Sequence, residues 1–301
     1  MNYPTFCSVL TFALSACAGS ETKITRQSVP KNNGVCLDAL ILKKAGSSCA
    51  PVIYLDPLYH LYQSGSPIES ICNSVLSCLE QKLPFPPEIC TKIQNLESVK
   101  DLIAFRLISR ESNEALLKGI PWVPFLDLAI VFFLDLSSGP DGHATALIHS
   151  HLASLWNTSA DQLLSIARKN TPLLFPSVIT RMEDLLPLPV PDSGSEDRVP
   201  ALHILTNRSG LYGASCILYE NAVKDFADRT ASDVIILPSS IHEVLLLPDD
   251  HPSDYDSLCD IVRSVNASAV AKEDVLAGHI YLYTRCDRTI RMWTSAFCHK
   301  P

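Results

Sequence analysis

The residues with the clearest chemical potential lie in one short segment, which contains Ser239, Ser240, His242 and Glu243 between two apolar stretches. These side chains supply a hydroxyl nucleophile, an imidazole base and a carboxylate that could orient the base, as in nucleophilic hydrolysis. Members of a catalytic triad usually come from distant segments, however, and serine in a turn often bonds to backbone amides. The segment therefore predicts a turn, with a ligand-binding pocket and a hydrolase site as alternatives.

Asn207 is a further candidate for the same ligand-binding surface, because it ends a predicted strand earlier in the chain. Asparagine at the end of an element is usually structural, since it tolerates left-handed backbone and bonds to its own turn. We expect Asn207 and the Ser239 to Glu243 segment to build one contact surface.

Three histidines form the pattern His-x₅-His-x-His, at His143, His149 and His151. On a strand, residues two apart face the same side, so His149 and His151 could share a metal ion. No carboxylate or cysteine nearby completes the ligand set, which favours solvated or helix-capping histidines. A zinc-protease helix is also excluded, because Leu246 stands where the pattern that begins at His242 needs its second histidine.

The composition excludes several classes of protein. The chain has 24 lysines and arginines, 32 aspartates and glutamates and a net charge of −8, which argues against non-specific binding of nucleic acid or anionic lipid. Neither a dinucleotide-binding glycine pattern, nor a P-loop, nor a Gly-x-Ser-x-Gly nucleophile elbow occurs. We therefore expect no cofactor and no nucleic-acid partner.

The cysteines and the N-terminus bear on the compartment. The sequence has 11 cysteines and no Cys-x-x-Cys pair, which favours free thiols in a reducing cytoplasm. The segment Leu14-Ser15-Ala16-Cys17 is similar to a lipoprotein cleavage site, so a lipid anchor through Cys17 is the alternative location. Residues 1–6 lack the positive charge of a signal peptide, and the apolar residues that follow have helical spacing. The longest apolar run, residues 128–134, is too short for a transmembrane helix.

Hydrophobic patterning and turn residues predict the elements. Helices are predicted from the start of the chain, from Ser66, from the capping box at Ser159, over residues 178–186 and 219–226, and from a cap at Ser253. Strands are predicted over residues 22–29, 35–43, 51–55, 102–108, 125–136, 144–148, 201–206, 214–218, 234–237, 244–247, 279–284 and 289–293. The first two strands flank Asn33-Gly34, a strong hairpin signal.

This mixture has no regular βαβ rhythm and predicts an α+β fold, with mixed, largely antiparallel sheets, packed helices and two lobes. Residues 187–200 contain four prolines and read as a linker or flexible loop. We expect an N-terminal lobe over residues 1–186 and a C-terminal lobe over residues 201–301.

Short motifs spread in order along nearly the whole chain carry a family resemblance. They are Lys31-Asn32-Asn33-Gly34, Phe125-Leu126-Asp127-Leu128, Trp156, Asn170-Thr171-Pro172, Leu205-Thr206-Asn207, Gly213-Ala214-Ser215-Cys216-Ile217-Leu218-Tyr219 and Ile236-Leu237-Pro238-Ser239-Ser240-Ile241-His242-Glu243-Val244. Through them the chain resembles the bacterial family catalogued as domain of unknown function 5688. More distantly, it is similar to domain of unknown function 1444. Neither resemblance implies an activity.

The function that these observations favour is a cytoplasmic, non-enzymatic binding or regulatory module whose ligand is an unidentified protein or small molecule. A hydrolase centred on the Ser239 to Glu243 segment and a lipid-anchored surface protein are the alternatives.

Overall fold

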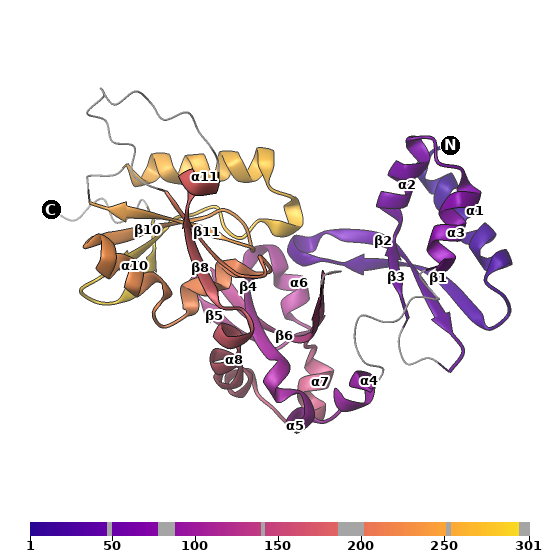
Figure 1. Cartoon of the computed structure of the whole chain (residues 1–301), viewed down its shortest axis with the longest axis horizontal. Helices are drawn as coiled ribbons and strands as arrows, with labels where there is room; N and C mark the ends of the chain where they lie inside the picture. Colours follow the sequence, from indigo (N-terminus) through magenta and orange to yellow (C-terminus); the bar gives the residue numbers. More distant parts are fainter. Residues whose placement is uncertain (47–49, 78–87, 140–141, 186–201, 251–253, 295–301) are drawn as a thin grey trace.

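The computed structural model describes residues 1–46, 50–77, 88–139, 142–185, 202–250 and 254–294. Figure 1 shows two lobes, a small one near the N-terminus and a larger one that we call the body. All strand pairs in the described residues are antiparallel, and helices pack against the sheets. The α+β fold with antiparallel sheets is therefore confirmed.

The N-terminal lobe packs helices on a three-stranded sheet of order β1-β2-β3. Its elements are α1 (Tyr3–Cys17), β1 (Thr22–Pro30), β2 (Cys36–Lys44), β3 (Val52–Tyr54), α2 (Leu55–Gln63) and α3 (Ile68–Ser77). Helix α1 buries Phe6, Leu10 and Leu14 against Leu40 of β2, so its predicted apolar stripe is confirmed. Cys17 is exposed at the end of that helix.

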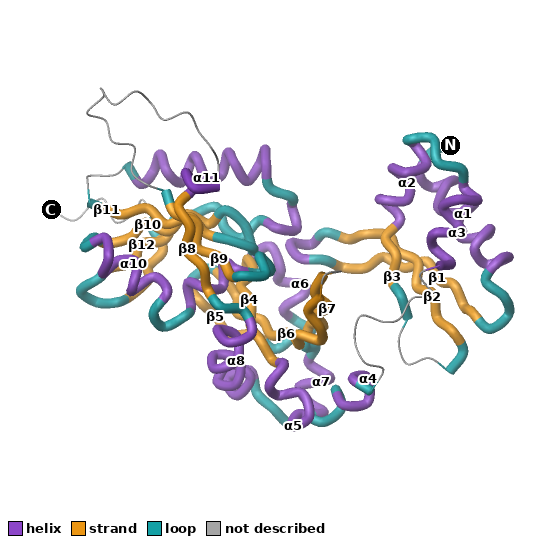
Figure 2. The backbone as a smooth tube through the Cα atoms, viewed as in Figure 1, coloured by secondary structure: helices purple, strands orange, loops and turns teal. Residues whose placement is uncertain are grey.

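The body contains two sheets. A four-stranded sheet is formed by β4 (Ile103–Ser109), β5 (Trp122–Phe125), β6 (Leu128–Gly139) and β7 (Gly142–Leu147). A six-stranded sheet of order β13-β12-β10-β11-β9-β8 is formed by β8 (Ser177–Arg181), β9 (His203–Asn207), β10 (Asp233–Pro238), β11 (Val244–Asp249), β12 (Tyr281–Thr284) and β13 (Thr289–Met292). Figure 2 shows these strands gathered together beside α11.

Helices cover both sheets of the body. They are α4 (Ile89–Lys92), α5 (Leu96–Val99), α6 (Glu114–Leu117), α7 (Ser150–Leu155), α8 (Ala160–Leu174), α9 (Met182–Leu185), α10 (Ala222–Thr230) and α11 (Tyr255–Ala269). Side chains alternate along β10: Ile235 packs with α11 on one face, and Val234 and Ile236 join the main core on the other. One core thus unites both sheets of the body.

A partly buried hydrogen bond reinforces the contact between the two sheets. The hydroxyl of Tyr281 on β12 donates to Oδ1 of Asp127, in the turn between β5 and β6, at 2.8 Å. Burial, together with the Asp127 charge, raises the pKa of Tyr281 well above its usual range. The hydroxyl therefore stays protonated and keeps donating at any ordinary pH.

Three sequence predictions about elements are wrong. Residues 125–136 are two strands rather than one, because Leu126 takes a left-handed conformation with φ 54° and turns the chain. Residues 178–186 form strand β8 and then the short helix α9, and residues 214–218 lie in a 3₁₀-helix, η4 (Gly213–Leu218). In these two segments a short apolar run fits both a helix and a strand, and tertiary packing decides between them. His149 and His151, which could share a metal ion on a strand, lie instead at the start of helix α7.

The hydrophobic cores indicate where the lobes separate. One core gathers residues from Phe6 to Val75, and the largest core of the body gathers residues from Ile89 to Tyr283. The linker predicted at residues 187–200 lies outside the described residues, as does the predicted cap Ser253; in the described chain Asp254 caps α11. The division of the chain at residues 187–200 stays a prediction.

The described cysteines are mostly free thiols. Cys7, Cys17, Cys36, Cys72, Cys216, Cys259 and Cys286 are unpaired, and burial raises the pKa of Cys216 to about 12. Cys90 is disulfide-bonded, so the expectation of free thiols does not hold at that residue. None of the helices in the described part of the chain has the length and apolar character that a membrane span requires.

The β1–β2 hairpin joins the two lobes, and Figure 1 shows it reaching from the N-terminal lobe to the body. Its tip is a 3₁₀-turn, η1 (Asn32–Gly34), in which Asn33 is left-handed with φ 56°. Nδ2 of Asn33 donates to the carbonyl oxygens of Lys272, at 2.8 Å, and Val275, at 2.7 Å. The amide of Asn113 in η3 (Glu111–Asn113) both accepts from and donates to Asn33 at 2.8 Å. Hydrogen bonds of buried asparagine amides therefore hold the tip against the body.

We predict that Asn33→Asp releases the hairpin tip. Aspartate fits the left-handed backbone, but its carboxylate cannot donate to the two carbonyl oxygens that Nδ2 satisfies. The docked tip should lose about 3 kcal/mol, which speeds hydrogen exchange of the Asn33 backbone amide roughly a hundredfold. Hydrogen–deuterium exchange with mass spectrometry on the tip peptide measures this.

The matched control is Asn157→Asp, because Asn157 is also left-handed, with φ 50°, but is exposed. This variant should leave exchange at the tip unchanged. Equal exchange in the wild type and the Asn33→Asp variant would show that the amide bonds do not hold the tip.

Candidate functional site

The predicted Ser239 to Glu243 segment forms the turn between β10 and β11. The Ser240 amide donates to the Glu243 carbonyl at 3.2 Å, and the Ser240 hydroxyl accepts from the His242 amide at 3.0 Å. The Ser239 hydroxyl donates to Oε1 of Glu243 at 3.3 Å. Within the described chain, neither hydroxyl bonds to the imidazole of His242. The predicted turn is confirmed, and both hydroxyls are engaged inside it.

The imidazole of His242 points away from the serines toward a second loop. Its Nδ1 lies 3.1 Å from the Gly210 carbonyl and 3.3 Å from the Tyr212 amide, while Nε2 lies 3.4 Å from Oδ1 of Asp274. A neutral ring can accept from Tyr212 through Nδ1 and donate to Asp274 through Nε2. A protonated ring can donate to Gly210 and Asp274 together. The ring is held in place in either state.

Asn207 builds the loop that meets His242. Its side chain is buried, with Nδ2 donating to the Leu211 carbonyl at 2.7 Å. Its Oδ1 accepts from the amide of Ser209 at 3.1 Å and from the Ser209 hydroxyl at 2.8 Å. Asn207 therefore acts on the site through the loop that it folds, which carries Gly210 and Tyr212.

A stack of side chains crosses the site from the six-stranded sheet to the four-stranded sheet. The Tyr212 ring lies on the His242 ring, with centroids 5.8 Å apart and planes 13° apart. The guanidinium carbon of Arg106, on β4, lies 4.3 Å from the centre of the Tyr212 ring. Tyr212 holds this position in a left-handed conformation, φ 56°, which a bulky residue rarely adopts. This strained backbone conformation places the Tyr212 ring against the imidazole of His242 and the guanidinium of Arg106.

A cavity of about 640 Å³ opens beside this stack, between the hairpin tip and the body. Arg106, Tyr212 and His242 line it from the body, and Lys31 and Asn32 line it from the tip. Nε of Arg106 is buried and has no hydrogen-bond partner among the described residues. The cavity is therefore shared by both lobes, and one of its lining residues has a buried charged donor without an acceptor.

Asn32, which lines the same cavity, has an acceptor without a donor. Its Nδ2 donates to the Glu273 carbonyl at 2.7 Å, which fixes the orientation of the amide. Its Oδ1 is buried and has no hydrogen-bond partner in the described part of the chain, and the residue is 9% exposed. One donor and one acceptor without partners thus belong to residues that line a single cavity.

The charges around the cavity are mixed. Lys31 and Arg106 are positive, and the Lys31 ammonium lies 4.2 Å from the centre of the Tyr54 ring. Glu273 and Asp274, in η5 (Lys272–Asp274), are negative, and Asp274 faces His242. In the described residues Arg106 has no carboxylate partner, so it is the cation best placed to attract an anion.

The predicted histidine cluster is only partly assembled. His149 precedes α7 at its N-cap, and its ring stacks on that of His151 with centroids 5.8 Å apart. The side chain of His143 lies outside what the structure describes. Across the described residues, no three histidine, cysteine, aspartate or glutamate side chains gather as a metal site would require. His149 lines the cavity beside Arg106.

Sequence reasoning identified His242 but missed Arg106, Asn32, Tyr212 and Asp274. One signal was available for Arg106, which is the single charge in the apolar strand at residues 102–108, because a charge in a buried strand needs a partner. The other three come from separate loops, and no local pattern shows that they meet.

These residues all fall inside the part of the chain that matches a known family. Residues 3–285 match a family of unknown function, DUF5688. The chain belongs to this family, as the motifs around Asn33, Asn207 and His242 indicated. Comparisons with curated proteins and with solved structures find no match.

We predict that Gly213→Ala destabilises the protein. A Cβ at this position would collide with Oγ1 of Thr206, the His242 carbonyl oxygen and the Asn207 amide nitrogen. Overpacking of this kind should lower the free energy of unfolding by about 1–3 kcal/mol. Urea denaturation measures the change. Gly119→Ala is the control, because its Cβ would meet Leu116 at an ordinary 3.7 Å, and an equal effect of both variants would contradict the predicted collision.

Proposed function

We propose that this protein is a binding module for a small organic acid that also carries a hydrogen-bond donor, such as a hydroxy acid or an amino acid. The ligand would occupy the cavity between the hairpin tip and the body. The observation that carries the proposal is a pair of buried polar atoms without partners, Nε of Arg106 and Oδ1 of Asn32, on two residues that line that cavity.

Arg106 supports an acidic ligand. A buried donor without an acceptor costs about 1–3 kcal/mol, and more when the donor is charged. A carboxylate removes this cost, because it forms a charge-assisted hydrogen bond with the guanidinium. Such a bond is stronger than one between neutral groups. The Tyr212 ring beneath the guanidinium holds the group flat, which prepares it for such a ligand.

Asn32 supports a donor on the same ligand. Because Nδ2 donates to the Glu273 carbonyl, the amide orientation is fixed and Oδ1 keeps its place as an acceptor. A hydroxyl or ammonium group near the acid would satisfy this oxygen. The cavity volume of about 640 Å³ is within the range of small-molecule sites.

The position of the cavity supports a regulatory role. A ligand bound to Arg106 and Asn32 would contact the body and the hairpin tip together, so binding would hold the lobes in one arrangement. The engagement of Ser239 and Ser240 in their turn favours binding over hydrolysis, since a nucleophile must lie within reach of its base.

We predict that wild-type protein binds L-malate or L-glutamate, measured by isothermal titration calorimetry. Succinate, which lacks the donor, should bind about tenfold more weakly than the better of these two acids. Arg106→Met keeps the aliphatic stem on Tyr212 and should abolish detectable binding.

Arg110→Met is the matched control, because Arg110 is exposed just beyond the same strand and does not line the cavity. It should bind as the wild type does. The proposal is wrong if neither malate nor glutamate binds, or if the Arg106→Met and wild-type proteins bind equally.

A further inference from the structure

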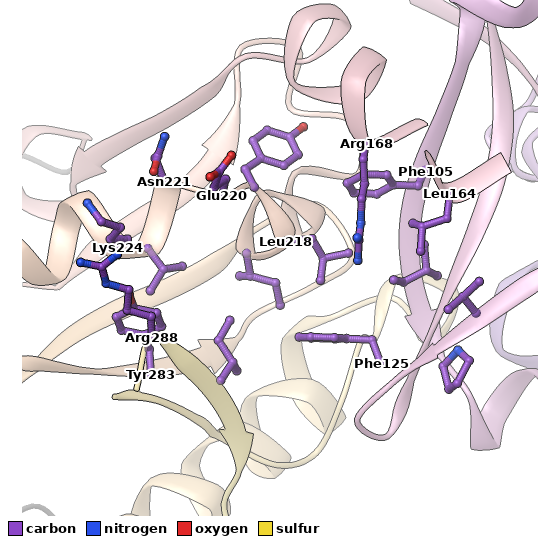
Figure 3. Close-up of a pocket in the computed structure, with 17 residues that line it drawn as sticks. Phe105, Phe125, Leu164, Arg168, Leu218, Glu220, Asn221, Lys224, Tyr283 and Arg288 are labelled. Carbon is purple, nitrogen blue, oxygen red and sulfur yellow. The ribbon is translucent and has the colours of Figure 1, made fainter. Parts of the chain in front are cut away.

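A second cavity, of about 510 Å³, lies in the body away from the hairpin tip. Figure 3 shows its lining, which comes from α8, the β5 strand, the segment from η4 into α10, and the β12–β13 hairpin. An adjoining hollow shares Arg168, Leu218 and Tyr219 with it. The cavity has none of the residues that were predicted from the sequence as a site.

Cations dominate the charged lining of this cavity. Arg168, Lys224 and Arg288 line it, against the single carboxylate of Glu220. This excess is unusual for a chain with 24 basic and 32 acidic residues. Lys224 is paired, with Nζ 3.2 Å from Asp228. In the described chain, Arg168 and Arg288 have no carboxylate partner, so their charges are available to a ligand.

The cations are separated by apolar surface. In Figure 3, Arg168 lies on one side of Leu218, and Lys224 and Arg288 lie on the other. Several apolar side chains also line the cavity, among them Phe125, Ile217, Leu218, Val223 and Ile290. A ligand that reaches both cationic ends must therefore cross an apolar stretch.

Arg288 occupies an unfavourable backbone conformation. It lies in the turn between β12 and β13 with φ 52°, which costs an L-residue other than glycine or asparagine about 1 kcal/mol. Asparagine or glycine would form the same turn without this cost. A strained position that nonetheless holds an arginine at the edge of a cavity is typical of a functional residue.

We infer that this cavity is a binding site for an organic diacid whose two acid groups are separated by an apolar chain. One acid group would meet Arg168, and the other would meet Arg288 beside Lys224. Because both arginines are exposed, each ion pair alone is weak. Tight binding therefore requires both acid groups and burial of the apolar chain between them. The site is independent of the cavity at the hairpin tip.

Isothermal titration calorimetry at low ionic strength tests this with three ligands. Sebacate has two carboxylates and a long apolar chain, succinate has a short chain, and octanoate has one carboxylate. Sebacate should bind about tenfold more tightly than succinate and than octanoate. Sebacate binding no tighter than either of the others would overturn the assignment.

Variants then locate the site. Arg168→Met and Arg288→Asn should each weaken sebacate binding about tenfold. Arg288→Asn suits the left-handed turn, so it keeps the fold intact even if Arg168→Met proves unstable by thermal unfolding. Lys169→Met, at the exposed neighbour of Arg168 on α8, should bind sebacate as the wild type does.

Two further outcomes are decisive. Sebacate binding that is unchanged in Arg288→Asn would overturn the assignment of this cavity. Arg106→Met should keep full sebacate affinity, and loss of sebacate binding in that variant would place the diacid in the cavity at the hairpin tip instead.

Discussion

The docking of Asn33 into the body is the interaction on which the arrangement of the lobes depends. The side-chain amide of Asn33 donates to two carbonyl oxygens, of Lys272 and Val275, and accepts from the side chain of Asn113. The same tip presents Asn32 to the Glu273 carbonyl, and the next residue, Asp274, faces His242. Four consecutive residues of the body therefore fix both the hairpin and the wall of the candidate site. The site exists because the tip is docked.

Tyr212 links the two sheets of the body at the candidate site. Its ring contacts both the imidazole of His242, in a turn of the six-stranded sheet, and the guanidinium of Arg106, on a strand of the four-stranded sheet. The loop that carries this ring is folded by the Asn207 side chain and pressed against the His242 carbonyl at Gly213. Charge, stacking and backbone strain are thus concentrated where two sheets and one hairpin converge, which is a common place for a ligand to bind.

Local signals predicted local structure well. The Asn33-Gly34 hairpin, the capping box at Ser159 and the turn at Ser240 are all present, because each depends on residues close in sequence. The strand expected at residues 214–218 failed because a short apolar run suits a buried 3₁₀-helix equally well. The partners of Asn33 and Arg106 could not be predicted, since they are joined by contacts between distant segments that leave no periodic pattern.

The contacts of the hairpin tip also set an order of events during synthesis. The amide of Asn32 meets the Glu273 carbonyl across a sequence separation of 241 residues. At a translation rate of about 5–20 residues per second, the hairpin leaves the ribosome on the order of ten seconds or more before its acceptors exist. The N-terminal lobe has its own core and can form during that interval, with the tip undocked. The two lobes can be joined only once η5 has emerged and its carbonyl groups meet a hairpin that is already formed.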